Sequence, residues 1–379
     1  MENKSNRKKI VFLTGTRADF GKMKSLINIV EKSDLFDVYI FATGMHMNNM
    51  YGRTVDEIIK CDYKNVFMYY NHIDYYAMDS ILSKTIDGFS NYVKDIQPDL
   101  IVIHGDRVET LAGAIVGALN NVLTAHIEGG ELSGTIDECI RHSVSKLCHV
   151  HFVSNNEAKK RLLQMGEELN SIFVIGSPDV DIMLSKKLPT LEDVKKRYEI
   201  KFDNYAVIMF HAVTTEYDQI SWQAENLVES VIDSGLNYIV IYPNNDKGSE
   251  FIFKMYSKFE GNTHIKIFPS MRFEYFLTLL KNASFILGNS SSGIMEAPYY
   301  GVPTINIGTR QMNRNINADI INCDYPAKEI TKSIQKALKM KVEKLKMYGV
   351  GESDKLFFKI LSSKKIWSVN KQKQFRDLL

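Results

Sequence analysis

The sequence predicts an α/β protein with two doubly wound domains, each built around a parallel sheet. Short apolar runs alternate with amphipathic segments along most of the chain, which is typical of βαβ units. The 379 residues are enough for two domains of ordinary size. Polar and charged residues follow almost every apolar run, at the strand ends where open parallel sheets bind ligands.

The first half of the chain alternates regularly. An apolar run at 9–14 precedes an amphipathic helix with Met23, Leu26, Ile27 and Val30 at helical spacing. Further strands are expected at 38–41, 100–103, 123–127, 149–153 and 172–175, and helices at 108–118 and 136–147.

A polar stretch at 185–204 then predicts a connection between domains. After it, strands are expected at 205–210, 238–242, 265–268, 285–287 and 304–307, and helices at 221–234, 273–282 and 294–300. The last helix-like segment covers about 354–379. We therefore expect a first domain over 1–184, a second over 185–353, and a final helix over 354–379 that folds back on the first domain.

Composition excludes several classes of function. With 47 Lys and Arg against 45 Asp and Glu, the chain lacks the basic excess that nucleic-acid binding needs. The longest apolar-looking stretch, 111–127, is interrupted by Asn120, Asn121 and His126, and falls short of the ~20 apolar residues of a membrane span. Four scattered cysteines favour reduced thiols. We expect a soluble cytoplasmic protein.

One stretch, 284–310, has the pattern strand, small-residue turn, helix and strand. The turn at 288–293 reads GNSSSG, and it offers backbone N–H groups and hydroxyls to an anion such as a phosphate. Glu296, inside the following helix, is suited to sugar or ribose hydroxyls. The alternative is a serine-capped helix with no ligand.

Charged residues at the first strand ends suggest chemistry. Arg17 and Lys22 follow the first strand and are suited to a phosphate, which is the interpretation we favour. The alternative is a helix whose amino end is capped by Asp19. Asp106 follows a fully apolar strand and is a candidate general acid or base. The alternative is a helix N-cap with Arg107 as its surface partner.

The next strand end concentrates acids. His126, Glu128 and Glu131 lie together with two glycines, and Asp137 and Arg141 follow on one helix face. The alternative for the last two is an exposed ion pair of small energy. In the second half, His211 follows a strand and is suited to a phosphate, or alternatively to the edge of the core.

His142, Cys148, His149 and His151 lack the spacing of a metal site, and we expect packing or surface roles for them. Neither a metal nor a redox cofactor is expected. Together the motifs predict a cleft between two domains that holds a nucleotide sugar, with the diphosphate near 290–292 and the sugar ring at the acids.

Several long motifs resemble the hydrolysing UDP-N-acetylglucosamine 2-epimerases of bacterial sialic acid synthesis, and the epimerase half of the bifunctional animal enzyme. They are TGTRADFGK, TGMHM, YGRT, IHGDRVETLAGA, HIEGGELSGTIDECIRHSVSKL, GSPD, YPNND, PSMRFEYFLTLLKNA, GNSSSGIMEAPYYGVPTINIGTRQ and QKQFRDL. They span nearly the whole chain. The resemblance implies a GT-B fold of two Rossmann-like domains, a UDP-sugar in the interdomain cleft, and a C-terminal helix that crosses back.

The resemblance also implies roles for individual residues. Those implied for acid–base catalysis or its orientation are Asp19, Asp106, His126, Glu128 and Asp137. Those implied for the substrate or UDP are Arg17, Lys22, Arg107, Arg141, His211, Asn245, Ser290, Ser291, Glu296 and Arg310. Met295 departs from many relatives, which have Arg at this position.

The reaction implied is elimination of UDP to a 2-acetamidoglucal, followed by addition of water to release N-acetylmannosamine. The alternatives are the same reaction on UDP-N,N′-diacetylbacillosamine in legionaminic acid synthesis, a non-hydrolysing epimerase, a GT-B glycosyltransferase, and a nucleotide-sugar sensor without turnover. We expect a homo-oligomer, either a dimer or a tetramer.

Overall fold

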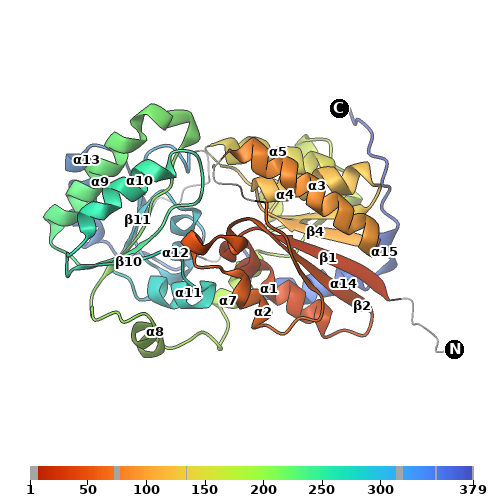
Figure 1. The fold of residues 1–379 in the computed structure, drawn as a ribbon, viewed down its shortest axis with the longest axis horizontal. Coiled ribbons are helices and arrows are strands. Elements are labelled where there is room, and N and C mark those ends of the chain that lie inside the picture. The colour runs from red at the N-terminus through yellow and green to blue at the C-terminus, as the bar shows by residue number, and fades with distance from the viewer. Residues whose placement is uncertain (1–6, 72–76, 134, 313–318, 346–347, 378–379) are drawn as a thin grey trace. The chain divides into compact units, whose positions relative to one another are not determined.

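The chain folds into two compact units, each with its own sheet (Figure 1). The computed structural model describes residues 7–71, 77–133, 135–312, 319–345 and 348–377. The first unit comprises Met1–Glu131, Asp137–Ser185 and Met347–Leu379, and the second comprises Leu132–Ile136 and Lys186–Lys346. Every strand pair among the described residues is parallel. The predicted α/β class with two doubly wound sheets is confirmed.

The first sheet has the order β3-β2-β1-β4-β5-β6-β7. Its strands are β1 (Lys8–Thr14), β2 (Phe36–Ala42), β3 (Val66–Met68), β4 (Leu100–His104), β5 (Leu123–Ile127), β6 (Val150–Val153) and β7 (Ile172–Val174). The order runs outward from β1 in one direction and from β4 in the other. The β1–β4 pair, in register at Ile10↔Leu100, is therefore the point where the winding reverses.

Helices cover both faces of this sheet, with a buried apolar cluster on each side. They are α1 (Arg17–Glu31), α2 (Val55–Ile59), α3 (Met78–Ile96), α4 (Val108–Leu119), α5 (Ile136–Leu147), α6 (Asn156–Gln164), α7 (Pro178–Met183), α14 (Ser353–Leu361) and α15 (Lys364–Trp367). Short 3₁₀ turns are η1 (Gly44–Met47), η2 (Asn49–Tyr51) and η3 (Leu169–Ser171).

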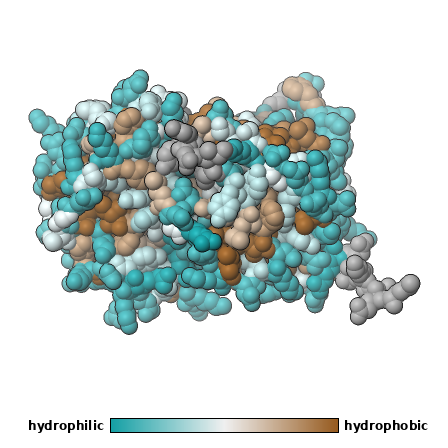
Figure 2. Space-filling view, in the orientation of Figure 1, coloured by the Kyte–Doolittle hydropathy of each residue, from teal (hydrophilic) through white to brown (hydrophobic). Residues whose placement is uncertain are grey.

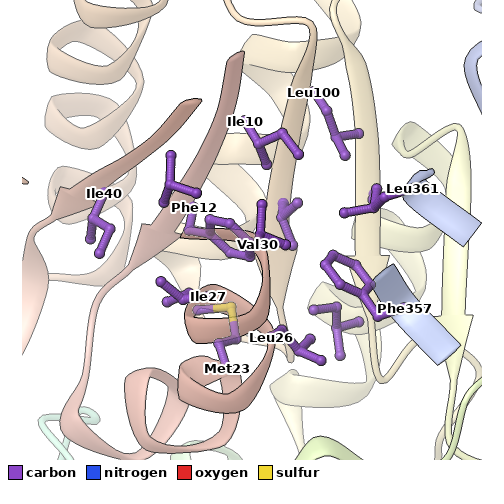
Figure 3. Close-up of a cluster of buried hydrophobic side chains, with 14 of the residues drawn as sticks. Ile10, Phe12, Met23, Leu26, Ile27, Val30, Ile40, Leu100, Phe357 and Leu361 are labelled. Carbon is purple, nitrogen blue, oxygen red and sulfur yellow. The ribbon is translucent and has the colours of Figure 1, made fainter. Parts of the chain in front are cut away.

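One of the two clusters joins distant parts of the sequence (Figure 3). The apolar stripe of α1, including Leu26 and Val30, packs on Phe12 of β1, as the helical spacing predicts. Phe357 and Leu361 of α14 complete the same cluster and are fully buried. The segment after the second unit thus returns to the core of the first.

The second sheet repeats the arrangement with the order β10-β9-β8-β11-β12-β13. Its strands are β8 (Ala206–Met209), β9 (Tyr238–Ile241), β10 (Ile265–Phe268), β11 (Ile286–Gly288), β12 (Thr304–Ile307) and β13 (Ile320–Cys323). Its helices are α8 (Leu191–Arg197), α9 (Ile220–Ser234), α10 (Ser249–Tyr256), α11 (Phe273–Lys281), α12 (Glu296–Tyr300) and α13 (Ala327–Ala337), with 3₁₀ turns η4 (Thr214–Gln219), η5 (Ser257–Phe259) and η6 (Ser291–Gly293). The winding reverses at β8 and β11.

The expectation of one helix over about 354–379 is wrong. The segment forms α14 and α15, and residues 368–377 are not helical. Ser362 and Ser363 separate the two helices, and each hydroxyl bonds a carbonyl of the preceding turn. Serine competes for backbone hydrogen bonds in this way, which favours a helix end.

No helix among the described residues is long and apolar enough to cross a membrane. The face of the molecule drawn in Figure 2 is mainly hydrophilic, with apolar residues in smaller groups between the polar ones. Exposed apolar surface is normal, because apolar atoms contribute more than half of a typical folded protein's surface.

We predict that Gly288→Ala destabilises the second unit strongly. Gly288 has φ of +138°, and a Cβ atom there would lie 2.0 Å from the Met209 carbonyl oxygen, which belongs to the neighbouring strand. We expect a loss of about 3 kcal/mol or more in the free energy of unfolding, measured by urea denaturation. Gly235→Ala is the matched control, since Gly235 also has positive φ but no atom within 4 Å of the added Cβ. Its cost should be ~1 kcal/mol, and equal losses in the two variants would contradict the steric argument.

Candidate active site

Side chains from several strand ends gather where the first sheet reverses. The strands β1, β4 and β5 lie side by side, and their carboxyl ends share one edge of the sheet. The residues at or after these ends are Asp19, Lys22, His104, Asp106, Glu128 and Glu131, and α5 adds Asp137 and Arg141. Open α/β sheets bind ligands at this place.

The buried guanidinium of Arg141 connects two of the predicted acids. One terminal nitrogen donates to the Glu128 carbonyl oxygen at 2.8 Å, and the other makes an ion pair with the Asp106 carboxylate. Burial lowers the pKa of Arg141, but the surrounding carboxylates, Asp106 first among them, raise it above its usual value. Arg141 is therefore a permanent cation that holds the ends of β4 and β5 together.

Glu128 is held as an ion by cations from other elements. Its Oε1 accepts from the Ser177 hydroxyl at 3.0 Å and lies 3.7 Å from Lys22 Nζ, while its Oε2 lies 3.2 Å from His104 Nε2. Burial raises the pKa of Glu128, but Lys22 and His104 outweigh burial and hold it well below the usual value. Its φ of +64° is uncommon for a residue with a side chain.

His104 and Lys22 are the partners that stabilise the ionised form of Glu128. Burial lowers the pKa of His104, but the nearby Glu128 carboxylate raises it further, so the net shift is upward. Lys22 Nζ also lies 3.3 Å from the Asp179 carboxylate. Burial alone favours a neutral acid, and here neighbouring charges reverse that effect.

His126 uses both ring nitrogens inside the fold. Its Nδ1 lies 3.0 Å from the Ser145 hydroxyl and its Nε2 lies 2.8 Å from the Gly105 carbonyl oxygen. The ring is fully buried, and burial lowers its pKa to about 3. A neutral ring that donates from Nε2 and accepts at Nδ1 satisfies both contacts. His126 therefore contacts the site through the Gly105 carbonyl, in the peptide bond that precedes Asp106.

Asp19 closes the amino end of α1. Its carboxylate accepts from the backbone N–H of Gly15 at 3.0 Å and of Thr16 at 3.1 Å, and it contacts the Thr14 hydroxyl. Thr16 is the N-cap and accepts from the Asp19 N–H, which completes a capping box. The helix-cap reading of the sequence is confirmed. Burial raises the pKa of Asp19 despite these hydrogen bonds.

The remaining charged residues predicted in this unit are placed as follows. Arg17 makes an ion pair of 2.6 Å with Glu57 of α2. Arg107 is half-buried and immediately precedes α4, and Asp137 is buried in the first turn of α5. Arg17 thus bonds an acid of its own unit, and its predicted role toward a phosphate stays a prediction.

Three histidines that superficially suggested a metal have protein partners. His142 bonds Glu138 at 2.9 Å, His149 accepts from the Thr124 N–H at 3.1 Å, and His151 bonds Glu167 at 2.9 Å. The described parts of the chain contain no cluster of three metal-ligating side chains.

In the second unit, Asn289 connects the two strands at the reversal. Its side-chain oxygen accepts from the His211 N–H at 2.7 Å, and its side-chain nitrogen donates to the His211 carbonyl at 2.9 Å. Its own carbonyl accepts from Arg310 at 3.2 Å and from Gln311 at 2.8 Å. Asn289 therefore fixes the ends of β8, β11 and β12 relative to one another.

The ring of His211 has a defined tautomer. Its Nδ1 accepts from the Asn244 N–H at 3.0 Å, so the proton of the neutral ring is on Nε2. A donor at this position suits an anion at the sheet edge. Asn245, next in the chain, is buried.

The glycine- and serine-rich turn differs in detail from the prediction. The turn at Ser291–Gly293 is 3₁₀, and α12 begins at Glu296 rather than at Ile294. The Ser290 hydroxyl accepts from the Ser292 N–H at 3.3 Å, so this serine caps the turn. Ser291 is half-buried, and Glu296, Met295 and Arg310 are buried.

Sequence reasoning missed three residues that hold these sites together. Asn289 lies in the turn at 288–293, and His104 and Asp179 lie in the motifs IHGDRVETLAGA and GSPD, but the sequence patterns predict no role for these three side chains. A signal existed for two of them, since His104 ends β4 and Asn289 directly follows β11, whereas Asp179 lies in α7. Their partners, however, lie tens of residues away and are set by strand order.

We predict that Asn289→Asp destabilises the second unit. The substitution removes the donor to the His211 carbonyl and places a carboxylate oxygen against it, so a buried acceptor loses its partner. We expect a loss of about 2–4 kcal/mol in urea denaturation. Asn204→Asp is the control, because Asn204 is exposed, and its effect should lie within about 0.5 kcal/mol. Similar losses in both variants would argue against this role of Asn289.

We predict that His126 contributes to acid sensitivity. The folded pKa of about 3 lies below the unfolded value of ~6.5, so the unfolded chain binds the extra proton between these values. Stability from this group is therefore present above about pH 6.5 and is lost as the pH falls. In His126→Gln the slope of unfolding free energy against pH should be shallower by up to about 1.4 kcal/mol per pH unit. The exposed His264→Gln variant is the control, and an unchanged slope in His126→Gln would refute the assignment.

The sequence matches known proteins along nearly its whole length. The family model described as UDP-N-acetylglucosamine 2-epimerase matches residues 28–362. A UDP-N-acetylglucosamine 2-epimerase of Neisseria meningitidis serogroup B is 47% identical over 375 residues, which cover 98% of this chain and 99% of the relative. A hydrolysing UDP-N,N′-diacetylbacillosamine 2-epimerase of Legionella pneumophila is 32% identical over 362 residues, with coverage of 94% and 96%.

A solved structure has the same fold. It is the UDP-N-acetylglucosamine 2-epimerase of Methanocaldococcus jannaschii in complex with UDP-N-acetylglucosamine and UDP. The TM-score is 0.81 at 24% identity, and the match covers 93% of this chain and 99% of that one. The fold of the chain is therefore the GT-B type, with two Rossmann-like domains.

Proposed function

The chain belongs to the UDP-N-acetylglucosamine 2-epimerase family, and we propose that it is a hydrolysing member, which converts UDP-N-acetylglucosamine to N-acetylmannosamine and UDP for sialic acid synthesis. The observation that carries the proposal is that buried Arg141 binds both the Asp106 carboxylate and the backbone carbonyl of Glu128. It brings two acids to the ligand edge of the first sheet, as a reaction with two proton transfers requires.

The proposed reaction has two stages. In the first, a carboxylate takes the proton from carbon 2 while the bond between carbon 1 and the UDP oxygen breaks, which gives 2-acetamidoglucal and UDP. In the second, water adds its oxygen to carbon 1 and a proton adds to the opposite face of carbon 2. We assign the proton transfers to Asp106, Glu128 and Asp137 as a group. Asp19 is a further acid at the same edge, and His126 orients the Gly105 peptide.

The second unit is assigned to UDP. The donor at His211 Nε2, the Ser290–Ser291 turn and the Arg310 guanidinium supply hydrogen bonds and positive charge for a departing diphosphate. Asn245 is assigned to the nucleotide and Glu296 to the ribose hydroxyls. In the first unit, the role of binding the substrate or orienting the acids is assigned to four cations: Arg17, Lys22, Arg107 and Arg141. A homo-oligomer and a cytoplasmic location also remain predictions.

A second candidate substrate is UDP-N,N′-diacetylbacillosamine. The relative of Legionella pneumophila, 32% identical across 94% of this chain, acts on that sugar by its name. The stronger identity to the Neisseria relative, 47%, favours UDP-N-acetylglucosamine. A glycosyltransferase would need an acceptor and would not need several acids at the sugar, so the acid cluster argues against it.

We predict turnover of the sugar nucleotide without any acceptor. The purified protein is incubated in heavy water with UDP-N-acetylglucosamine, and in parallel with UDP-N,N′-diacetylbacillosamine. Free N-acetylmannosamine with deuterium at carbon 2 supports the proposal, because the proton lost in the first stage is replaced from solvent. Release of UDP-N-acetylmannosamine would instead show a non-hydrolysing epimerase. Turnover of only the second sugar would reassign the substrate, and binding without turnover would leave a sensor.

Glu128→Gln tests the acid–base assignment. The variant keeps the shape of the side chain but removes the carboxylate, so we expect kcat to fall by about 10²–10⁴-fold. The exposed Glu157→Gln variant is the control and should retain wild-type activity. Wild-type kcat in Glu128→Gln would remove Glu128 from the proposed group.

A further inference from the structure

The segment after α15 is bound to the far end of α5 through one lysine. Lys373 Nζ donates to the Cys148 carbonyl at 2.7 Å and to the Ser145 carbonyl at 3.3 Å. These carbonyls belong to the last turn of α5 and the residue after it, where no further helical N–H groups follow. A cation at a helix carboxyl end also opposes the partial negative charge there.

A buried carboxylate holds the lysine in this position. Lys373 Nζ lies 2.5 Å from the Oε2 atom of Glu167, which is 2% exposed. Lys146 and His151 bond the same carboxylate at 3.2 and 2.9 Å. Burial raises the pKa of Glu167, but the hydrogen bond from His151 and the charge of Lys373 lower it to about 2. Lys373 thus belongs to a built ion network, unlike a surface lysine.

A second contact fixes the backbone of the same segment. His149 Nε2 lies 3.1 Å from the Lys371 carbonyl, and its Nδ1 accepts from the Thr124 N–H at the start of β5. The neutral ring donates from Nε2 and accepts at Nδ1. The segment is thereby joined to α5 at one residue and to β5 at another.

From α5 the hydrogen bonds continue to the acids. The Ser145 carbonyl accepts from Lys373, and the Ser145 hydroxyl bonds His126, whose other nitrogen bonds the Gly105 carbonyl beside Asp106. The same helix carries Arg141, which binds the Asp106 carboxylate. The position of Asp106 therefore depends on α5 along two routes.

We propose that Lys373 is a positioning residue for the acid–base cluster: it caps α5 at its carboxyl end and so fixes the register of the helix that holds Asp106 and Glu128. This inference rests on the proposed function. Lys373 lies in the QKQFRDL motif. Lys373 does not touch the substrate, and its effect reaches the acids only through α5.

The test compares Lys373→Met, Lys373→Arg and Lys371→Met in the full chain. Methionine keeps the apolar stem and removes the charge, whereas arginine keeps donors for the two carbonyls and Glu167. We expect Lys373→Met to lower kcat about 10-fold or more, with KM within about twofold, because displaced catalytic groups lose rate rather than binding. Lys373→Arg should recover most of kcat. Lys371→Met should match the wild type, because the Lys371 side chain is exposed.

Two further measurements separate positioning from general stability. All kinetic assays are made well below the melting temperature of each variant. Amide hydrogen exchange of residues 137–147 should be faster in Lys373→Met than in the wild type, and unchanged in Lys373→Arg and Lys371→Met. In the double variant Lys373→Met/Ser145→Ala, the fold-loss in kcat should be smaller than the product of the two single-variant losses. The reason is that both residues act through the same chain of hydrogen bonds.

Unchanged kcat in Lys373→Met, or an equal loss in Lys371→Met, overturns the proposal. Failure of the proposed function can be told apart from failure of this inference, because the wild type would then turn over neither sugar nucleotide. In that case hydrogen exchange decides, and an unchanged rate at residues 137–147 in Lys373→Met overturns the inference by itself.

Discussion

The reversal of strand order in each sheet is the constraint on which both candidate sites depend. Chain connections leave β1 and β4 in opposite directions along the first sheet, and the same holds for β8 and β11 in the second. No connection therefore crosses the shared end of either pair, so the groups that follow these strands meet there. Because they are buried, they must satisfy one another's hydrogen bonds and charges.

The two units meet this requirement with different chemistry. The first uses a cation, Arg141, to join a carboxylate and a carbonyl from adjacent strands. The second uses the neutral amide of Asn289, which pairs with both backbone groups of His211. The charged joint binds the Asp106 carboxylate at the edge, and it acts with Lys22 and His104 to lower the pKa of Glu128. The neutral joint fixes the backbone without adding charge.

Much of the fold could be predicted because parallel strands are buried on both faces and appear as apolar runs, as β4 and β5 do. The proximity of Asp106 and Glu128 was also predictable, because carboxyl ends of parallel strands share an edge. Other features depend on contacts between residues far apart. β3 is short and partly exposed, so its pattern is weak. The Asn289–His211 pair spans 78 positions, and no local periodicity encodes it.

Asp19 and Glu128 show how far environment decides the state of an acid. Both are buried carboxyl groups at the same sheet edge, and burial raises the pKa of each. The partners of Asp19 on α1 and β1 are mainly neutral donors, so burial prevails and its pKa stays raised. Glu128 faces Lys22 and His104, and these charges lower its pKa.

One edge of the first sheet therefore holds an acid biased to keep its proton beside one biased to lose it. Such a divergence is the pattern expected where proton donors and acceptors must coexist at one pH. The lowered pKa of Glu128 arises from Lys22 on α1 and His104 on β4. The residue types and spacing around Glu128 in the sequence do not reveal these two neighbours. The carboxylates alone suggest acid–base chemistry, whereas burial around Asp19 and the cations beside Glu128 shift the two pKa values in opposite directions.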